Sequence, residues 1–333
     1  MHSAATIAGG SASDDAIVAR GLVKRFGPVV ALDGLSLRVV RGSCFGLLGP
    51  NGAGKTTTVS VLTTLALADE GSAAVLGCDV VAERARVRRE LGLVFQETTL
   101  DPELTAREQL DLHARLYHLE ARRERVAEAL ALAGLEGDAD RPVRGFSGGM
   151  KRRLELVRGL LHRPRILFLD EPTLGLDVAA RAGIWEELRR LQRTGDVTLF
   201  LTTHSMDEAD ALCDALAIVD RGRVVAEGPP EALKAALGGD VVVLSLERAA
   251  PRDEVVTLLA ALPGVKSVTH DRVGHLFRVL VGNGPQRLPE LLYAVQPFGV
   301  REVQLHRPSL EHVFLHHTGH AFERRDGAGE DME

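Results

Sequence analysis

The first 235 residues alternate between short apolar runs and segments with a helical period. Apolar runs bounded by Gly and Pro predict strands at residues 17–20, 35–40 and 44–48. A glycine-rich loop follows the third run, and a helix is predicted from Lys55 to about residue 65. This succession is typical of the opening of an α/β domain.

The middle of the chain, about residues 96–162, is predicted to be mostly helical. Segments 105–119 and 122–133 carry apolar residues at roughly helical intervals, namely Leu110, Leu112, Leu116, Leu119, Val126, Leu130 and Ala133. We therefore expect a helical insertion over about 97–163, within the α/β domain.

Strand patterns return after this insertion. All-apolar runs at 166–169 and 197–201 predict strands buried on both faces, as in a parallel sheet. Between them, segment 179–193 predicts an amphipathic helix with one apolar face, formed by Ile184, Leu188 and Leu191. Segments 216–220 and 223–227 predict a hairpin.

Beyond residues 238–240, which the composition predicts to be a linker, the order of elements changes. It becomes strand (241–247), helix (252–262), strand (265–273), strand (275–281), helix (286–295) and strand (300–305). This order is the split, ferredoxin-like β-α-β-β-α-β unit, and a last helix is predicted at 309–318. We therefore expect a disordered N-terminus at residues 1–15 and a first domain at 16–237. A C-terminal accessory domain at 241–318 and a flexible tail at 319–333 are expected to follow.

Composition limits the classes of protein that fit these elements. Of the 333 residues, 45% are hydrophobic and 26% charged, so a packed core is expected rather than global disorder. The net charge of −6 gives no general attraction for nucleic acid. Cys44, Cys78 and Cys213 are far apart and are predicted to be reduced core thiols. Signal-peptide, membrane-span and lipid-anchor patterns are not evident, so a membrane process would need another polypeptide to cross the bilayer.

The glycine-rich loop after residues 44–48 carries the first chemical signal. It fits the pattern G-x-x-x-x-G-K-[ST], with Gly49, Pro50, Asn51, Gly52, Ala53, Gly54, Lys55 and Thr56. Glycines let backbone N–H groups point at phosphate oxygens, and the helix N-terminus behind them favours an anion. We expect Lys55 to reach the β- and γ-phosphates of a nucleotide, Thr56 to ligate Mg²⁺, and Thr57 to help bind the nucleotide.

The apolar run at 166–169 ends on two carboxylates, Asp170 and Glu171. Ligands of open α/β sheets bind at the C-terminal ends of the strands. We expect Asp170 to hold Mg²⁺, directly or through water, and Glu171 to orient and polarise an attacking water. Standing alone, this acidic pair would also fit the N-cap of the next helix.

Two weaker signals gain weight from their positions along the chain. Ser147, Gly148 and Gly149 open a helical stretch and would make a second anion site, although flexible turns have the same composition. His204 ends the strand that would lie beside the Asp170 strand, so its ring is expected near a γ-phosphate. A lone histidine is more often structural than catalytic.

The order of these motifs resembles that of the nucleotide-binding subunits of ATP-binding-cassette (ABC) transporters, over about residues 16–235. The resemblance implies an α/β fold of the ABC P-loop NTPase type, with an antiparallel β part and a helical subdomain, followed by the small C-terminal α+β domain. It implies that Gln96 touches Mg²⁺ and senses a membrane partner. It also implies that Asp177 crosses a dimer interface and that Phe26 stacks on adenine.

The match departs from the family pattern at a few positions. The usual L-S-G-G-Q signature has Phe146 and Met150 at its ends, and Val178 stands where a proline is common. The expected catalytic side chains, Glu171, His204 and Gln96, are all present, so we expect a hydrolysing site.

Two segments narrow the resemblance to the daunorubicin/doxorubicin-resistance type. They are S-G-G-M-K-R-R at 147–153 and P-S-L-E-H-V-F-L at 308–315. This type partners with small six-helix permeases and exports drugs or other amphiphiles, while related subunits serve polysaccharide, lipid or sodium export. The resemblance implies a head-to-tail homodimer that binds ATP and Mg²⁺, on the cytoplasmic face of the membrane and beside a separate permease.

Alternatives from other classes remain. A soluble, non-transport ABC ATPase acting on ribosomes or DNA would usually carry two cassettes, long coiled coils or zinc modules, none of which is evident. A P-loop GTPase or kinase would not need the S-G-G signature or His204, and no N-K-x-D motif follows the loop.

We interpret two basic clusters, Arg84–Arg89 and Lys151-Arg152-Arg153, as solvated helix faces. His312 and His316 lack partners at matching positions for a zinc site.

Overall fold

The computed structural model describes residues 14–247, 251–270 and 276–319, in two compact units divided between Val224 and Val225. The expected disordered N-terminus lies outside the described residues up to residue 13, and so does the expected tail from residue 320. For Asp15 the expectation is wrong, because β1 (Asp15–Phe26) begins there and its carboxylate pairs with Arg38 at 2.6 Å.

The central sheet has six strands in the order β10-β9-β3-β8-β7-β6, and β10 continues past the division between the units. Their bounds are β10 (Arg223–Gly228), β9 (Ala215–Asp220), β3 (Cys44–Leu48), β8 (Thr198–Thr203), β7 (Ile166–Asp170) and β6 (Leu91–Val94). Parallel pairing joins β9 to β3, β3 to β8, β8 to β7 and β7 to β6. Every residue of β3, β7 and β8 is buried, as the all-apolar runs predict for a sheet covered on both faces.

A second sheet, in the first unit, contains β2 (Val29–Val40), β1, β4 (Glu70–Val75) and β5 (Cys78–Asp79), in that order. Neighbouring strands in it pair antiparallel, which confirms the antiparallel part implied by the resemblance. β1 and β2 are longer than their predicted apolar runs. The sequence analysis missed β4, which opens with the exposed residues Glu70, Gly71 and Ser72.

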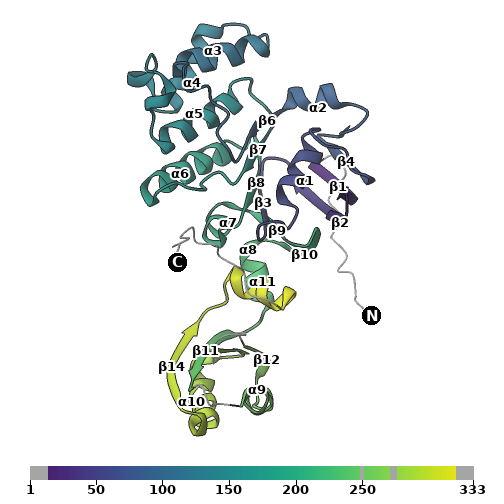
Figure 1. The fold of residues 1–333 in the computed structure, drawn as a ribbon, viewed down its shortest axis with the longest axis vertical. Helices are drawn as coiled ribbons and strands as arrows, with labels where there is room; N and C mark the ends of the chain where they lie inside the picture. Colours follow the sequence, from purple (N-terminus) through teal and green to yellow (C-terminus); the bar gives the residue numbers. More distant parts are fainter. Residues whose placement is uncertain (1–13, 248–250, 271–275, 320–333) are drawn as a thin grey trace, which may run out of the picture. The chain divides into compact units, whose positions relative to one another are not determined.

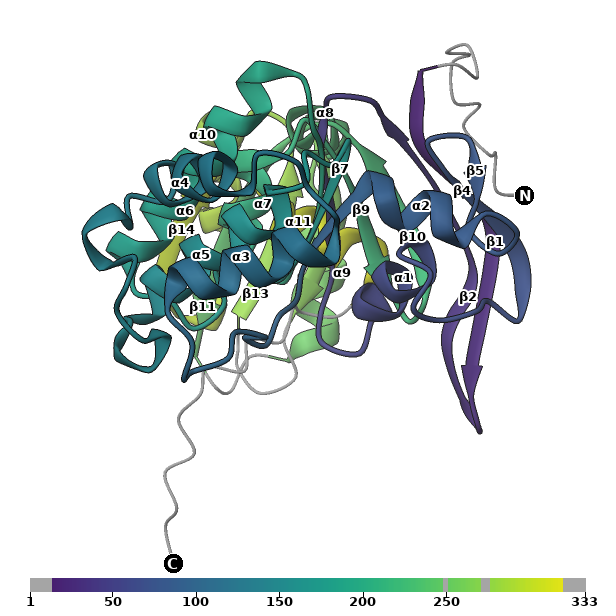
Figure 2. The same cartoon turned by 90° about the horizontal axis from the view of Figure 1, so that it is seen from above.

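Seven helices are described in the first unit. They are α1 (Lys55–Leu62), α2 (Arg84–Glu90), α3 (Ala106–Leu116), α4 (Arg122–Leu132), α5 (Gly148–Leu160), α6 (Val178–Thr194) and α7 (Met206–Leu212). Figures 1 and 2 show α3, α4 and α5 gathered at one side of the unit, with β1, β2 and β4 at the other. Within the described part of the chain, no helix has the length and apolar character needed to cross a membrane.

The apolar face predicted for α3 is partly wrong. Leu110 is fully buried, but Leu112 and Leu116 are 49% and 68% exposed. The buried stripe instead runs through Ala106, Leu110 and Ala114, four residues apart, where small alanines permit close helix packing. The two leucines therefore leave an apolar surface on the outside of the helical insertion.

The second unit is built on a four-stranded sheet of order β12-β13-β11-β14. Its elements are α8 (Pro230–Ala236), β11 (Asp240–Leu246), α9 (Arg252–Ala260), β12 (Val265–His270), β13 (Leu276–Val281), α10 (Gly284–Val295), β14 (Val300–His306) and α11 (Leu310–Thr318). All three strand pairings are antiparallel, which confirms the predicted β-α-β-β-α-β unit. Part of the strand predicted over 265–273 lies outside the described residues.

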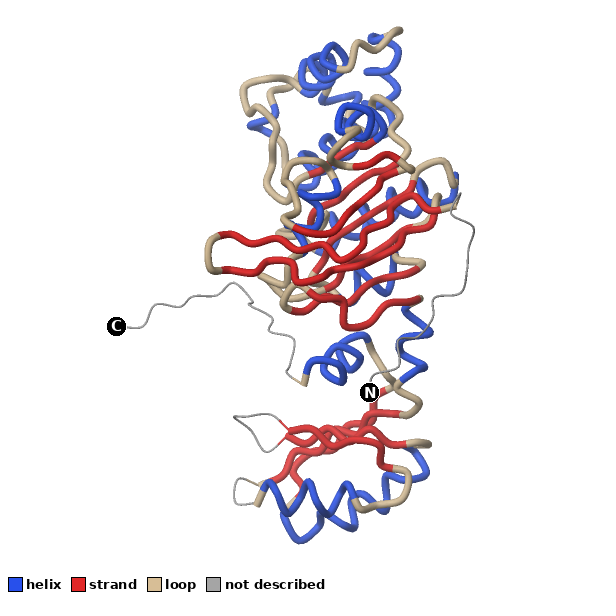
Figure 3. The backbone as a smooth tube through the Cα atoms, turned by 90° about the vertical axis from the view of Figure 1, so that its right-hand side faces the viewer, coloured by secondary structure: helices blue, strands red, loops and turns tan. Residues whose placement is uncertain are grey.

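The two faces of this sheet are covered differently. α9 and α10 cover one face, where Val242, Leu244, Phe277 and Val279 form the core with residues of both helices. α11, which packs against α8, lies over the other face (Figures 1 and 3). Because side chains alternate along β11 and β13, Val241 and Arg278 belong to this second face.

One basic residue of α5 contradicts the interpretation of its cluster as a solvated face. Arg152 is only 6% exposed. Its guanidinium donates to four backbone carbonyls, those of Phe95, Asp170, Glu171 and Pro172, at 2.7–3.2 Å. It also pairs with Glu155 at 3.1 Å, and Glu155 accepts from the Thr99 N–H at 3.0 Å. The guanidinium is buried because the chain turns after β6 and β7 supply its acceptors.

We expect Arg152→Ala to destabilise the first unit by about 3–5 kcal/mol, since it leaves the buried Glu155 carboxylate without its cation. The matched control is Lys151→Ala on the same helix turn, which we expect to change stability by less than about 0.5 kcal/mol. Urea unfolding followed by fluorescence of Trp185, the single tryptophan of the chain, measures both. Equal midpoints for the two variants would refute the anchoring role.

Candidate nucleotide site at the carboxyl edge of the central sheet

Four neighbouring strands of the central sheet end at one edge. Because β3, β8, β7 and β6 run parallel, the segments that follow them meet there, as at the ligand-binding edge of other α/β sheets. The loop 49–54 follows β3, His204 follows β8, and Asp170-Glu171 ends β7. Gln96 lies two residues after β6 and is exposed. The structure thus brings the loop 49–54, Asp170, Glu171, Gln96 and His204 to one edge.

The loop 49–54 wraps the N-terminus of α1, and its shape requires glycine. Gly54, the N-cap of α1, has φ of 104°, a conformation that other residues rarely adopt. A side chain there would also approach the Ala31 carbonyl oxygen within 2.5 Å, and one at Gly49 would approach the Val219 oxygen within 2.4 Å. The loop is therefore held tightly against its neighbours. The N–H groups of the first turn of α1 need partners from outside the helix, which suits a phosphate.

Three side chains form the charged centre of the site. Lys55 Nζ lies 3.1 Å from Glu171 Oε1 and donates to the Gly49 carbonyl at 2.8 Å. His204 Nδ1 lies 2.5 Å from the other carboxylate oxygen, Glu171 Oε2. Lys55 and Glu171 are each only 6% exposed, so this ion pair is shielded from water. One buried carboxylate is thus held between two nitrogen donors.

This arrangement sets the protonation of the pair. Burial raises the pKa of Glu171, but the His204 hydrogen bond and the Lys55 and His204 charges outweigh it, and the pKa falls below the ordinary 4.5. The hydrogen bond to Glu171 raises the pKa of His204 above 6.5, against the effect of burial. At neutral pH Glu171 is therefore ionised, and the site favours a protonated His204.

The backbone aims these carboxylates by an unusual turn. Glu171 has φ of 49°, in the left-handed region that costs a non-glycine residue free energy. Its N–H donates to the carbonyl and the hydroxyl oxygens of Thr202, at 3.2 and 3.1 Å. The Thr202 hydroxyl in turn donates to Asp170 Oδ1 in a short hydrogen bond. β8 therefore fixes both acidic residues at the end of β7.

The residues expected to hold Mg²⁺ fit that ion. Thr56 Oγ1 lies 3.5 Å from Asp170 Oδ1, and adjacent ligands of an octahedral Mg²⁺ lie about 3 Å apart. A small side-chain movement would let both oxygens bind one ion or share a bound water. In the described ranges, no group of three or more His, Cys, Asp or Glu side chains could hold a metal. A site with few protein ligands suits Mg²⁺, which keeps waters and binds substrate phosphates.

The remaining predicted residues lie outside this centre. Ser147 caps α5 by accepting from the Met150 N–H at 3.2 Å, and Asp177 caps α6 by accepting from Ala180 at 2.8 Å. Phe26, at the end of β1, is 54% exposed and has Lys24 Nζ 5.4 Å from its ring centroid. Within the described residues, none of the three bonds to the charged centre. Their roles in a nucleotide site stay predictions.

Two residues that shape the site were missed by the sequence analysis. Thr202 orients Asp170, and Arg152 holds the chain turns after β6 and β7. A polar residue near the end of an otherwise apolar strand is a signal for Thr202. The spacing of Arg152 and Glu155, which places opposite charges on one helix face, is a weak signal for Arg152.

Two family profiles and several solved structures match this chain. The ABC transporter family profile matches residues 32–174. A second profile, described as the C-terminal domain of ATP-binding proteins like DrrA1-3, matches residues 228–318. Structural similarity extends to cbiO1 from Clostridium perfringens, part of an ABC transporter complex, with a TM-score of 0.62 and 25% identity over 75% of this chain and 96% of that one. A dimeric ATP-binding cassette bound to ADP and Pi matches with a TM-score of 0.59 and 27% identity, over 64% of this chain and 98% of that one.

Relatives of similar length match almost end to end. The daunorubicin resistance ATP-binding protein DrrA3 of Streptomyces coeruleorubidus is 45% identical, over 92% of this chain and 97% of that protein. The Nod factor export ATP-binding protein I of Burkholderia orbicola is 43% identical, over 90% of this chain and 96% of that protein. These matches confirm the predicted resemblance, and the chain belongs to the ATP-binding subunits of ABC transporters, a family of ATPases, with a C-terminal domain of the DrrA1-3 type.

Proposed function

We propose that this subunit drives an exporter of drugs or other amphiphilic compounds, through a separate membrane permease. The observation that carries the hydrolytic part is the buried carboxylate of Glu171, held between Lys55 and His204 beside a phosphate loop. Export is supported by the relatives, which are described as daunorubicin resistance and Nod factor export proteins. The same relatives disfavour a soluble ABC ATPase acting on ribosomes or DNA.

Each residue of the centre has a distinct role in the proposed hydrolysis. The Lys55 ammonium exchanges the Gly49 carbonyl and Glu171 for the β- and γ-phosphates of ATP. Glu171, whose lowered pKa makes it a weak base, orients and polarises the attacking water rather than storing its proton at neutral pH. His204 holds Glu171 in place and faces the γ-phosphate.

Thr56, Asp170 and Gln96 would hold Mg²⁺ next to these groups. Mg²⁺ would neutralise charge on the phosphate oxygens. Thr202 keeps the Asp170 carboxylate turned toward Thr56, so the protein ligands are arranged before nucleotide arrives.

We propose that two copies associate head to tail. Each ATP would then lie between residues 49–57 of one copy and Ser147–Gly149 of the other, with Asp177 crossing the interface and Phe26 against adenine. Ser147, Gly148 and Phe26 are exposed, as this arrangement requires. A related cassette is described as a dimer in a post-hydrolysis state. ATP then stabilises the closed dimer by binding both copies.

The permease would dock on the cytoplasmic side of the membrane, at a groove beside Gln96. This groove has a volume of about 360 Å³ and is lined by residues that include Leu65, Phe95, His113, Tyr117 and His162. Leu65 and Phe95 are 55% and 40% exposed, and the exposed Leu116 neighbours Tyr117 on α3. Arg152 holds the Phe95 carbonyl and also the Glu171 carbonyl, which offers a mechanical link between the groove and the hydrolytic centre.

We expect Glu171→Gln to lower Mg²⁺-ATPase turnover roughly 10²–10⁴-fold while ATP binding persists, because it removes the charge that polarises water. Turnover is measured on the full chain, alone and with its candidate permease in lipid vesicles. Stimulation by the permease that disappears in the variant would support the transporter proposal. Wild-type-like turnover in the variant would refute the role of Glu171, and hydrolysis indifferent to any permease would favour a non-transport ATPase.

Lys55→Ala should weaken ATP binding itself, because the phosphates lose their buried cation. Equilibrium binding of a fluorescent ATP analogue to the full chain measures the effect. Lys151→Ala, which removes a cation outside the loop, serves as the control and should bind like the wild type. An unchanged affinity in Lys55→Ala would contradict the role of the loop.

The His204 pKa should fall toward 6.5 in Glu171→Gln, since the carboxylate is what raises it. A proton NMR titration of the histidine C–H resonances, with His204→Gln for assignment, measures this change. The stability contributed by the pair is full below pH about 6.5 and is lost as pH rises through the folded-state pKa of His204. A His204 pKa that is the same in both proteins would exclude the proposed pairing in solution.

A further inference from the structure

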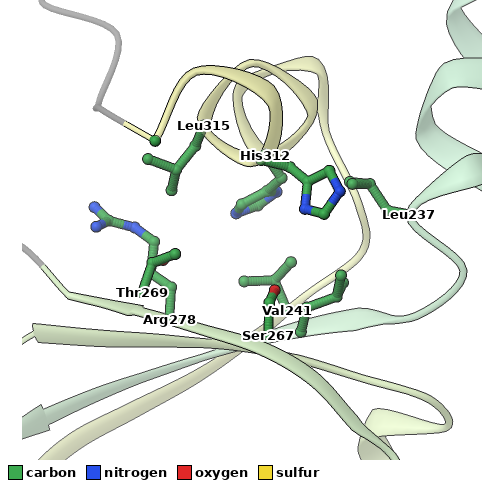
Figure 4. Close-up of a pocket in the computed structure, with 10 residues that line it drawn as sticks. Leu237, Val241, Ser267, Thr269, Arg278, His312 and Leu315 are labelled. Carbon is green, nitrogen blue, oxygen red and sulfur yellow. The ribbon is translucent and has the colours of Figure 1, made fainter. Parts of the chain in front are cut away.

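The second unit contains a cavity that the ATPase function does not use. It lies between α11 and the sheet face opposite α9 and α10, and its volume is about 250 Å³ (Figure 4). β11, β12 and β13 form its floor, α11 forms its roof, and Leu237, just after α8, closes one side. All of its lining residues belong to the second unit.

Most of the cavity wall is apolar. Val241 and Leu280 are buried in the floor, with 4% and 7% of their surfaces exposed, and Leu237 is 6% exposed. Figure 4 shows Leu315 descending from α11 toward the sheet that carries Val241. Such a wall would remove a short hydrocarbon segment from water, at a gain of roughly 0.8 kcal/mol per buried CH₂.

One charged group enters this apolar space. The Arg278 side chain rises from β13 toward α11 (Figure 4) and is half-buried. Among the described residues it has no hydrogen-bond or ion-pair partner, and no Asp or Glu lines the cavity. Ser267 and Thr269, on the adjacent β12, add two hydroxyl groups to the same wall. A guanidinium with unused donors beside hydroxyl groups is a suitable binding group for a carboxylate.

His312, in the roof of the cavity, adds little positive charge to that of Arg278. His312 Nδ1 is occupied by Ser309, whose N–H donates to it at 3.1 Å. Burial lowers the pKa of His312 below 6.5. The negative charge of Glu311 raises this pKa, whereas the charges of His306 and Arg278 lower it further. His312 is therefore mostly neutral at pH 7, and Arg278 is a fixed positive charge among the described residues that line the cavity. Its guanidinium suits the single negative charge of a carboxylate.

We propose that this cavity binds a small amphiphilic carboxylate, with its head group on Arg278 and its hydrocarbon tail among Leu237, Val241, Leu280 and Leu315. The volume of about 250 Å³ accommodates the chain of a medium-chain acid. The site is separate from the ATP centre, so this binding does not depend on the proposed mechanism of hydrolysis or on the exported compound.

Isothermal titration calorimetry of the full chain with sodium octanoate tests the proposal. Octanoate should bind with one site per chain, 1-octanol should bind roughly tenfold or more weakly because it lacks the charge, and acetate should not bind because it lacks the tail. Equal binding of octanol, or no octanoate binding up to its solubility limit, would overturn the proposal. Binding to anionic lipid vesicles without octanoate binding would assign the cavity to membrane lipid and overturn it as well.

Variants locate the bound molecule. Arg278→Gln should weaken octanoate binding roughly tenfold or more, whereas the matched control Arg301→Gln, at an exposed arginine of β14, should leave it unchanged. Thr269→Glu would place a carboxylate beside Arg278 and should also weaken octanoate binding. This second variant keeps the test valid if Arg278→Gln does not fold. Circular dichroism checks folding. Wild-type affinity in both folded variants would place octanoate elsewhere and refute the site.

Discussion

Parallel hydrogen bonding between β6, β7, β8 and β3 places four chain turns at one edge of a buried sheet, and each turn carries a residue of the candidate site. Residues separated by more than a hundred positions in the chain, such as Thr56 and Asp170, become neighbours for this reason. The register is strongly specified because the strands are buried on both faces, where slippage would disrupt the packing. The phosphate loop, the acidic pair and His204 all depend on it.

Charge balance at this edge follows from burial. Lys55 and Glu171 are both almost inaccessible to water, so each requires the other until a nucleotide supplies phosphate oxygens. Arg152 is a second buried charge near this edge. Carbonyl oxygens at strand ends and the Glu155 carboxylate accept its hydrogen bonds. These contacts join α5, which follows the Ser147 cap, to the turns that bear Gln96 and Glu171. Under the proposed mechanism, these contacts would connect a movement of the helical insertion to Gln96 and Glu171.

The second unit also packs helices against a sheet, but different helices cover its two faces. Its antiparallel sheet packs one face against α9 and α10, where β11 and β13 supply most of the buried core. α11 covers the other face, where Arg278 lines a cavity together with apolar residues. This guanidinium has no partner among the described residues, so water or a ligand would satisfy its donors. This contrast between the two faces distinguishes a purely structural layer from a candidate binding layer.

The sequence by itself determined the motif order, the buried strands β3, β7 and β8, the helical insertion, and the β-α-β-β-α-β order of the second unit, because these rest on local residue types and periods. It did not predict β4 or β6, which are short or partly polar and exist as strands through pairing with their neighbours. Nor did it predict the burial of Arg152 or the exposure of Leu112 and Leu116. Periodicity shows which positions share a face, but only tertiary structure decides which face meets a partner and which charged group finds acceptors in the interior.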